Sequence, residues 1–301
     1  MTDFAWPSLE PERRILAEIG VEVVVAESGD EDELVELAGE VDAILTNWKP
    51  VTERVLRSAP RCLTVARYGV GLDNIDVTAA TELGIVVSNV PDFCVDEVSD
   101  HALALVLALS RHIVDFAHQT STGGWDHKAF GEMRRLRGQT LGLIGFGRIS
   151  RRVAAKAQAF GFDVLAYSPS LTPGEHDGVR AASFEEVLGS SAVSLHAPLT
   201  PTTRHLIGAD QLAMMRPGAF LVNTARGALV DEAAMIAALK SGHIRHAGLD
   251  VFATEPLPPG HELTTLPNVT LSAHSAFRTP EASEALLRRA LDIACKVAGK
   301  A

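Results

Sequence analysis

The sequence predicts an α/β protein built from doubly wound parallel sheets, and three observations support this fold class. Short apolar runs rich in Val, Ile and Leu alternate with longer amphipathic runs, as in parallel βαβ units. One of these runs leads directly into a glycine-rich turn and a helical pattern, TLGLIGFGRIS at 140–150. The chain has 301 residues, a length that suggests about two domains.

The predicted elements follow one another in a regular order. Strands are expected at 21–26, 42–46, 63–67, 85–89, 140–145, 163–167, 192–196, 220–223, 246–251 and 269–273. Apolar residues recur with a helical period between them, at 32–40, 51–58, 149–161 and 232–242. A long helical region over 94–118 joins a first block of elements to a second, and a last helix covers 279–298.

Charge and composition narrow the possible functions. Lys and Arg number 27 and Asp and Glu number 38, so the net charge is −11. Nucleic acids and anionic membranes both require a basic surface, and we expect neither as a partner. The three cysteines form no CxxC motif, which favours a reducing compartment and argues against a zinc ribbon or any other metal site. With no apolar run of 18 residues and no signal-peptide pattern, we expect a cytoplasmic protein.

The turn at 145–150 is the main cofactor motif. Gly145 permits a tight turn after the strand, and Gly147 lets backbone amides approach a pyrophosphate at the start of the next helix. The third position is Ser150, which is small enough for close helix–strand packing. An acid normally ends the second strand and holds the ribose hydroxyls, but this chain has Ser168 there. We therefore expect NAD or NADP with little discrimination, NAD being slightly favoured.

Seven stretches, in order over nearly the whole chain, form a distinctive set: RYGVGLDNID (67–76), NVPDFCVDEVSDHALALVLALSR (89–111), GQTLGLIGFGRIS (138–150), LHAPLTPTTRHLI (195–207), NTARGALVDEAAMIAAL (223–239), GLDVFATEP (248–256) and SAHSAFRTPEA (272–282). Together they resemble the D-isomer-specific 2-hydroxyacid dehydrogenases, in the branch of phosphoglycerate dehydrogenases and C-terminal-binding-protein corepressors. The resemblance implies two Rossmann-like domains with the active site in the cleft between them. It places the substrate domain at 1–92 plus 278–301 and the NAD(P)-binding domain at 93–277. It also implies a homodimer formed through the cofactor domain, with an arm at 94–136.

Reduction of a 2-keto acid requires a cation for the substrate oxygens and an acid that protonates the developing alkoxide. Arg226 follows the strand at 220–223, and its planar guanidinium matches a carboxylate. His274 follows the strand at 269–273, and a carboxylate such as Glu255 would orient an imidazolium and balance its charge. Taken singly, such residues are more often surface charges or structural histidines. Within their motifs, the resemblance implies the family's substrate arginine, acid–base histidine and carboxylate partner.

The resemblance also implies the surrounding site. Asp250 corresponds to a contact of the nicotinamide carboxamide, although it also suits a capping or salt-bridge role. His101 is expected to serve helix packing rather than chemistry. The other cofactor-binding candidates are Gly145, Phe146, Gly147, Arg148, Ile149, Ser168, His196, Ala197, Pro198, Thr203, Thr224 and Ala225. The substrate-binding candidates are Trp48, Arg67, Val70, Gly71 and Phe277, where the turn at 69–71 can form an anion-binding nest.

We therefore expect an NAD(P)-dependent D-2-hydroxyacid dehydrogenase that transfers hydride between nicotinamide and C2 of a small 2-keto or 2-hydroxy acid. A dinucleotide-sensing, corepressor-like binding protein is the alternative, since both classes retain the same three residues. Formate dehydrogenase is disfavoured because that relative has Gln at the position of Glu255. Family members begin with a strand that ends at the position of Asp3, so a chain extended upstream by about six residues is expected to melt at a higher temperature.

Overall fold

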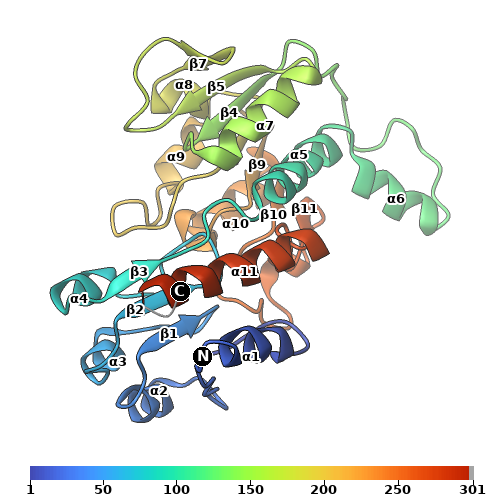
Figure 1. Cartoon of the computed structure of the whole chain (residues 1–301). Helices are drawn as coiled ribbons and strands as arrows, with labels where there is room; N and C mark the ends of the chain where they lie inside the picture. The colour runs from blue at the N-terminus through green and yellow to red at the C-terminus, as the bar shows by residue number, and fades with distance from the viewer. Residues whose placement is uncertain (298–301) are drawn as a thin grey trace. The chain divides into compact units, whose positions relative to one another are not determined.

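The computed structural model describes residues 1–297 and confirms the predicted α/β class, with two largely parallel sheets (Figure 1). The chain forms two compact units. Unit 1 contains residues 1–94 and the C-terminal segment from residue 279, and unit 2 contains residues 95–278.

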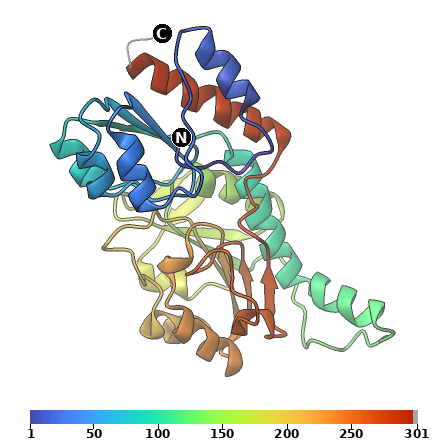
Figure 2. The same cartoon turned by 90° about the horizontal axis from the view of Figure 1, so that it is seen from below.

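Unit 1 is a three-layer arrangement around a small parallel sheet. Its strands β1 (Ala43–Thr46), β2 (Thr64–Arg67) and β3 (Val86–Ser88) lie in the order β1-β2-β3. Helices α2 (Glu31–Ala38), α3 (Glu53–Arg57) and α4 (Val77–Glu82) pack on the face that carries Ile44 and Val65. Helices α1 (Glu10–Ala17) and α11 (Pro280–Val297) pack on the face that carries Leu45 and Ala66 (Figure 2). Adjacent residues of a strand point to opposite faces, which explains the short, continuous apolar runs.

The strand predicted at 21–26 is wrong, because these residues do not form a regular strand. Their backbone bonds are few: the Met1 amino group donates to the Val24 carbonyl at 2.7 Å, the Ala26 amide donates to the Met1 carbonyl at 3.0 Å, and the Val21 amide donates to the Leu16 carbonyl of α1 at 2.9 Å. The Thr2 amide in turn donates to Leu45 of β1 at 2.9 Å. A strand requires a ladder of paired residues, and a two-residue neighbour is too short to supply one.

Unit 2 is built on an eight-stranded sheet with the order β11-β10-β9-β8-β4-β5-β7-β6. Only β6 is antiparallel to its neighbour. The strands are β4 (Thr140–Ile144), β5 (Asp163–Tyr167), β6 (Glu175–His176), β7 (Val179–Ala181), β8 (Ala192–Leu195), β9 (Ala219–Asn223), β10 (Ile244–Leu249) and β11 (Val269–Leu271). The sequence analysis missed β6 and β7, which are too short to show periodicity. The order reverses between β4 and β8, and open α/β sheets bind ligands beyond the carboxyl ends of the strands at such a reversal.

Helices cover both faces of this sheet. Helices α5 (Val95–Ser110) and α7 (Arg148–Ala159) pack on one face. Helices α8 (Phe184–Leu188), α9 (Ala209–Met214) and α10 (Glu232–Lys240) pack on the other. The helical region predicted at 94–118 is two helices, because His112 adopts the left-handed φ of 51° and separates α5 from α6 (Ile113–Ser121). Helix α6 projects from the body of unit 2 as an arm (Figures 1 and 2).

Candidate active site

The turn that carries Arg226 is shaped by the last residue of β9. Asn223 is buried, and its side-chain amide donates to the Arg226 carbonyl at 2.8 Å. Its side-chain oxygen accepts from the Ala225 amide at 3.0 Å. The chain then enters a short 3₁₀ turn, η1 (Gly227–Leu229). Arg226 is therefore held at the carboxyl end of β9 by a side chain that bonds both the Ala225 amide and the carbonyl of Arg226 itself.

Gly227 allows this turn to lie directly against the loop after β10. A Cβ at Gly227 would be 1.9 Å from the Phe252 carbonyl carbon and 2.5 Å from the Ala253 nitrogen. Only a hydrogen fits in that space, and this close approach joins the loop of Arg226 to the loop that leads to Glu255.

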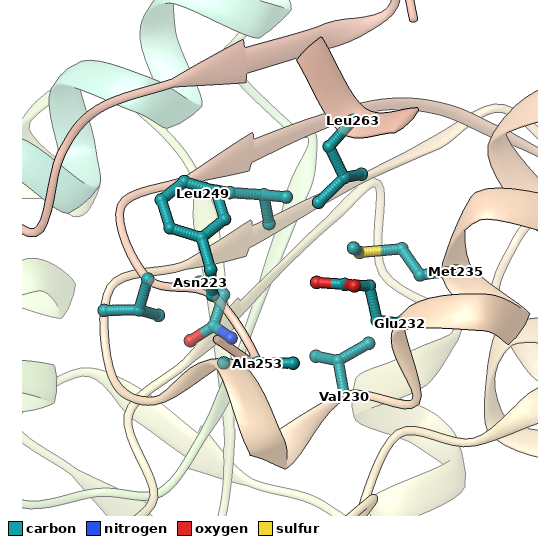
Figure 3. Close-up of a pocket in the computed structure, with 10 residues that line it drawn as sticks. Asn223, Val230, Glu232, Met235, Leu249, Ala253 and Leu263 are labelled. Atoms are coloured by element: carbon teal, nitrogen blue, oxygen red, sulfur yellow. The ribbon is translucent and has the colours of Figure 1, made fainter. Parts of the chain in front are cut away.

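A small pocket borders the contact made by Gly227 (Figure 3). Its lining is mostly apolar, and the Glu232 carboxylate points into it among Val230 and Met235. The pocket is lined by Asn223, Gly227, Val230, Glu232, Met235, Leu249, Val251, Phe252, Ala253 and Leu263.

Glu255 and His274 form a direct pair. His274 Nδ1 lies 2.6 Å from Glu255 Oε2, and Glu255 Oε1 accepts from the Phe252 amide at 2.9 Å. Burial raises the pKa of the Glu255 carboxyl, but the His274 hydrogen bond and charge, the Phe252 amide and the charge of Arg226 together hold that pKa below its usual range. Glu255 is thus an anion near neutral pH, and it lies within the electrostatic reach of both Arg226 and His274. The structure brings these three predicted residues together.

Asp250 anchors the loop that carries His274. Its carboxylate is fully buried and accepts from the Ser272 hydroxyl at 2.6 Å and from the amides of Ser275 and Ala276 at 2.9 and 3.0 Å. Its carbonyl accepts from the His274 amide at 2.8 Å. These bonds support His274 in a left-handed backbone conformation, with φ 47°, which is uncommon for a residue other than glycine. Asp250 Oδ1 also lies 3.7 Å from His101 Nε2, and no helix begins at Ser275, so these contacts anchor a loop rather than cap a helix. The contact of Asp250 with nicotinamide stays a prediction.

The glycine-rich turn between β4 and α7 has the geometry that a pyrophosphate requires. Gly145 has φ 92°, and a Cβ there would be 2.6 Å from the His196 carbonyl carbon, so only glycine fits. Gly147 is the N-cap residue of α7, and no heavy atom lies within 4 Å of the position of its absent Cβ. There is therefore free space beside Gly147 at the start of α7, where the helix dipole favours an anion.

The side-chain hydroxyl of Thr224 is a second feature that is consistent with a bound cofactor. The hydroxyl of Thr224, which follows β9 directly, is buried without a hydrogen-bond partner in the structure. Buried hydroxyls normally have a partner, and a polar ligand group would supply one.

Other predicted cofactor residues follow neighbouring strands of the same sheet. The Ser168 hydroxyl, just after β5, lies 3.2 Å from that of Ser170. Burial lowers the pKa of His196 to about 4, so its imidazole is neutral near pH 7. Thr203 donates to the Pro198 carbonyl at 2.7 Å. Phe146 is buried, Arg148 and Pro198 are exposed, and the half-buried positions are Ile149, Ala197 and Ala225.

Four of the predicted substrate residues belong to unit 1. Arg67 is buried, and its guanidinium donates to the carbonyls of Asn47, at 3.3 Å, and Gly71. These bonds connect the loop that contains Trp48 to the turn that contains Val70 and Gly71. The Trp48 side chain is exposed, while its amide donates to the Asp3 carboxylate at 2.7 Å.

The fifth predicted substrate residue, Phe277, belongs to unit 2. Its ring meets the His274 ring edge-on, with 6.4 Å between centroids. Phe277 is therefore a neighbour of the proposed acid–base histidine.

The sequence analysis missed Asn223, Gly227 and Ser272. Asn223 and Gly227 stand within the stretch NTARGALVD, and Ser272 begins SAHSAF. The contacts of Gly227 and Ser272 join segments far apart in the chain, whereas those of Asn223 are local but depend on the turn that follows β9.

Over residues 1–297, no helix is long and apolar enough to cross a membrane. The same residues include no group of three or more His, Cys, Asp or Glu side chains arranged to hold a metal ion.

Comparison with known proteins defines the class. Residues 103–276 match the model for the D-isomer specific 2-hydroxyacid dehydrogenase, NAD binding domain. This match covers more than half of the chain, so the protein belongs to that family, and the resemblance seen in the sequence is confirmed.

Two curated relatives share 42% identity with the chain. The D-3-phosphoglycerate dehydrogenase of Methanocaldococcus jannaschii aligns over 284 residues, 93% of this chain and 54% of that protein. The glyoxylate reductase of Thermococcus litoralis aligns over 263 residues, 84% of this chain and 79% of that protein. The chain thus spans about half the length of the phosphoglycerate dehydrogenases that it matches.

Solved structures agree with this assignment. The D-lactate dehydrogenase of Aquifex aeolicus, in complex with NAD and lactic acid, is 26% identical with a TM-score of 0.86, over 97% of this chain and 93% of that one. An acyclic imino acid reductase in complex with NADPH and D-Arg is 28% identical with a TM-score of 0.87, over 99% of this chain and 95% of that one. Structural neighbours thus include both an NAD complex and an NADPH complex.

Proposed function

We propose that the protein is an NAD(P)-dependent D-2-hydroxyacid dehydrogenase acting on a small 2-keto or 2-hydroxy acid. The observation that carries this proposal is the pair of Glu255 and His274, 2.6 Å apart and within reach of the charge of Arg226, in a unit with a family NAD-binding fold. An anion-binding cation, an acid and a carboxylate that orients the acid are the groups that keto-acid reduction requires.

Each of the three side chains has a distinct task in reduction. Arg226 binds the substrate carboxylate and polarises the C2 carbonyl. Glu255 accepts a hydrogen bond from the N–H at Nδ1 of His274. Nε2 is then the nitrogen that gives its proton to the C2 oxygen. Glu255 also balances the imidazolium charge before the transfer. The bound nicotinamide supplies the hydride that C2 receives, so the ketone becomes a hydroxyl group; in oxidation His274 takes the proton back.

The cofactor residues suit either nicotinamide. The open start of α7 at Gly147 fits the pyrophosphate, and the Thr224 hydroxyl offers a polar partner deeper in the site. Ser168 carries neither a negative charge that would repel a 2′-phosphate nor a positive charge that would bind one. Glu175 and Asp177 follow Ser168 in the chain. Their negative charges disfavour a nearby 2′-phosphate, so NAD is slightly preferred over NADP.

The proposal assigns residues 1–92 and 278–301 to substrate binding and residues 93–277 to NAD(P) binding. The unit 1 candidates are Trp48, Arg67, Val70 and Gly71. Support comes from Arg67, whose buried guanidinium connects the two loops that carry the other three. Phe277 is the unit 2 candidate, because it adjoins His274.

We also propose a homodimer formed through the arm at 94–136. The arm exposes large apolar side chains: Ile113 and Val114 are 56% and 44% exposed, and Trp125 is 88% exposed. Burial of such side chains against a second copy of the chain would be favourable. A cytoplasmic location is supported by the cysteines Cys62, Cys94 and Cys295, none of which forms a disulfide.

The test is a turnover panel with NADH and NADPH as reductants and glyoxylate, pyruvate, hydroxypyruvate and phosphohydroxypyruvate as substrates. We expect turnover with at least one keto acid and loss of that turnover in His274→Ala. Tight NADH binding without turnover of any keto acid would refute the proposal and favour the corepressor-like class.

A further inference from the structure

A partly buried chain of hydrogen bonds connects His101 on α5 to the loop of His274. His101 Nε2 lies 2.9 Å from the Ser272 hydroxyl oxygen, and that hydroxyl lies 2.6 Å from Asp250 Oδ1. Asp250 in turn accepts from the amides of Ser275 and Ala276, directly after His274. All of these residues belong to unit 2.

The chemistry of the three groups sets the direction of each bond. An ionised carboxylate only accepts, so the single Ser272 hydroxyl proton is donated to Asp250. The Ser272 oxygen is then the acceptor in its contact with His101, and His101 Nε2 must carry a proton. His101 therefore donates to Ser272, and Ser272 donates to Asp250, whether His101 is neutral or charged.

At the His101 end, the hydrogen-bond chain is anchored on a well-packed helix. His101 stands near the middle of α5, a helix of 16 residues whose Val98, Ala102 and Leu105 are buried. Helix α5 packs on β9 and β10, the strands that precede the loops of Arg226 and Glu255. The helix thus offers a fixed reference point for the segment 272–276. That segment includes His274 with its unusual φ of 47° and needs such support.

We propose that His101 is a positioning residue for the reaction, acting through Ser272 and Asp250 on the loop that carries His274. The inference rests on the proposed function, because His274 is the proton donor only if the protein reduces a keto acid. The hydrogen bonds run from α5 to the segment 272–276, which carries His274 and not Arg226. Loss of His101 therefore affects the proton-transfer geometry more than substrate binding.

Two substitutions separate the hydrogen bond from mere packing. His101→Phe keeps a planar ring but removes the donor, and His101→Gln keeps an N–H donor without the ring. We expect kcat of His101→Phe to fall by about tenfold or more, with KM for the keto acid within about threefold of wild type. We expect His101→Gln to recover kcat to within about threefold. The exposed His205, outside the arm at 94–136, provides the control: His205→Gln should leave kcat unchanged.

Ser272→Ala provides an independent route if His101→Phe fails to fold. Ser272→Ala should lower kcat to a similar extent. Adding His101→Phe to Ser272→Ala should cause little further loss of kcat, because both substitutions break the same series of hydrogen bonds. A double variant with the product of the two separate losses would contradict the inference.

A second measurement does not depend on activity. Long-range ¹H–¹⁵N NMR of ¹⁵N-histidine-labelled protein should show a proton on His101 Nε2, with the signal assigned by its absence in His101→Gln. A neutral His101 protonated on Nδ1, wild-type kcat in His101→Phe, or a His101→Gln as slow as His101→Phe would each overturn the inference. Failure of the proposed function is a different result, because wild type would then turn over no keto acid.

Discussion

Substitution of Gly227 by alanine tests how the site is assembled. The added Cβ would lie 1.9 Å from the Phe252 carbonyl carbon and 2.1 Å from its oxygen. Ordinary carbon–carbon contacts are about 3.5 Å or longer, so the two loops must separate by about 1.5 Å. The atoms in the way belong to the backbone, and no rotamer change relieves the clash. The φ of Gly227 is not in the left-handed region, so alanine adds no backbone strain and the effect is steric.

This displacement has a measurable consequence for catalysis. The separated loops carry Arg226 on one side and Glu255 on the other. A misplacement of about 1 Å near reacting groups typically costs about 100-fold, and we expect kcat/KM of Gly227→Ala to fall at least that far. Overpacking of this kind costs about 1–3 kcal/mol of stability, so the melting temperature should fall by several degrees while the protein stays folded.

The assay is steady-state reduction of the best keto acid by NADH, with circular dichroism melting of the same samples. The matched control is Gly39→Ala, at the exposed end of α2, where φ is −60° and the added Cβ meets no atom within 4 Å. It should retain wild-type kcat/KM and melt at the same temperature or slightly higher. Wild-type kcat/KM in folded Gly227→Ala would refute the view that the Gly227–Phe252 contact sets the geometry of the site.

Four shorter predictions concern charge and cofactor. Arg226→Ala should lower kcat/KM by several orders of magnitude with NADH affinity nearly unchanged, because the guanidinium acts on the keto acid; retention of a tenth of wild-type efficiency would contradict this. Glu255→Gln should stay active at low pH, while the alkaline limb of its kcat/KM profile moves to lower pH because the amide no longer balances the His274 imidazolium; an unchanged profile would count against the pair. The kcat/KM values with NADH and NADPH should differ by less than about thirtyfold, since Ser168 neither repels nor pairs with a 2′-phosphate, and a ratio above about a hundredfold would be inconsistent with this. The pKa of His196, lowered from 6.5 to about 4 by burial, means that the unfolded chain takes up a proton first as the pH falls. Urea unfolding should therefore show stability declining from pH 6.5 towards 4, by at most about 3 kcal/mol from this group, and His196→Gln should flatten that decline.

The amino-acid sequence determined the fold class, most strands and the position of each candidate residue along the chain. Strands buried on both faces appear as continuous apolar runs, a signal that needs no knowledge of the partner strand. The turn at Gly145 and Gly147 is recognisable for a similar reason, because a strand, two glycines and a helix are local features. Arg226 and His274 were found because each directly follows a strand within a distinctive motif.

Tertiary structure decided what depends on contacts between distant segments. Residues 21–26 have strand composition, but their backbone bonds go to Met1 and to Leu16 of α1 rather than to a neighbouring strand, so no ladder forms. His112 interrupts a helical pattern through its φ of 51°, which composition does not reveal.

The same holds for the site. Gly227 is required because the backbone of Phe252, in another loop, occupies the space of a side chain, and His101 acquires a partner in Ser272, which is 171 residues away. Periodicity and motifs report which residues occur near one another in the chain. The distance between Glu255 and His274, and the hydrogen bonds that hold the His274 loop on Asp250, arise only when the carboxyl ends of neighbouring strands meet at one edge of a packed sheet.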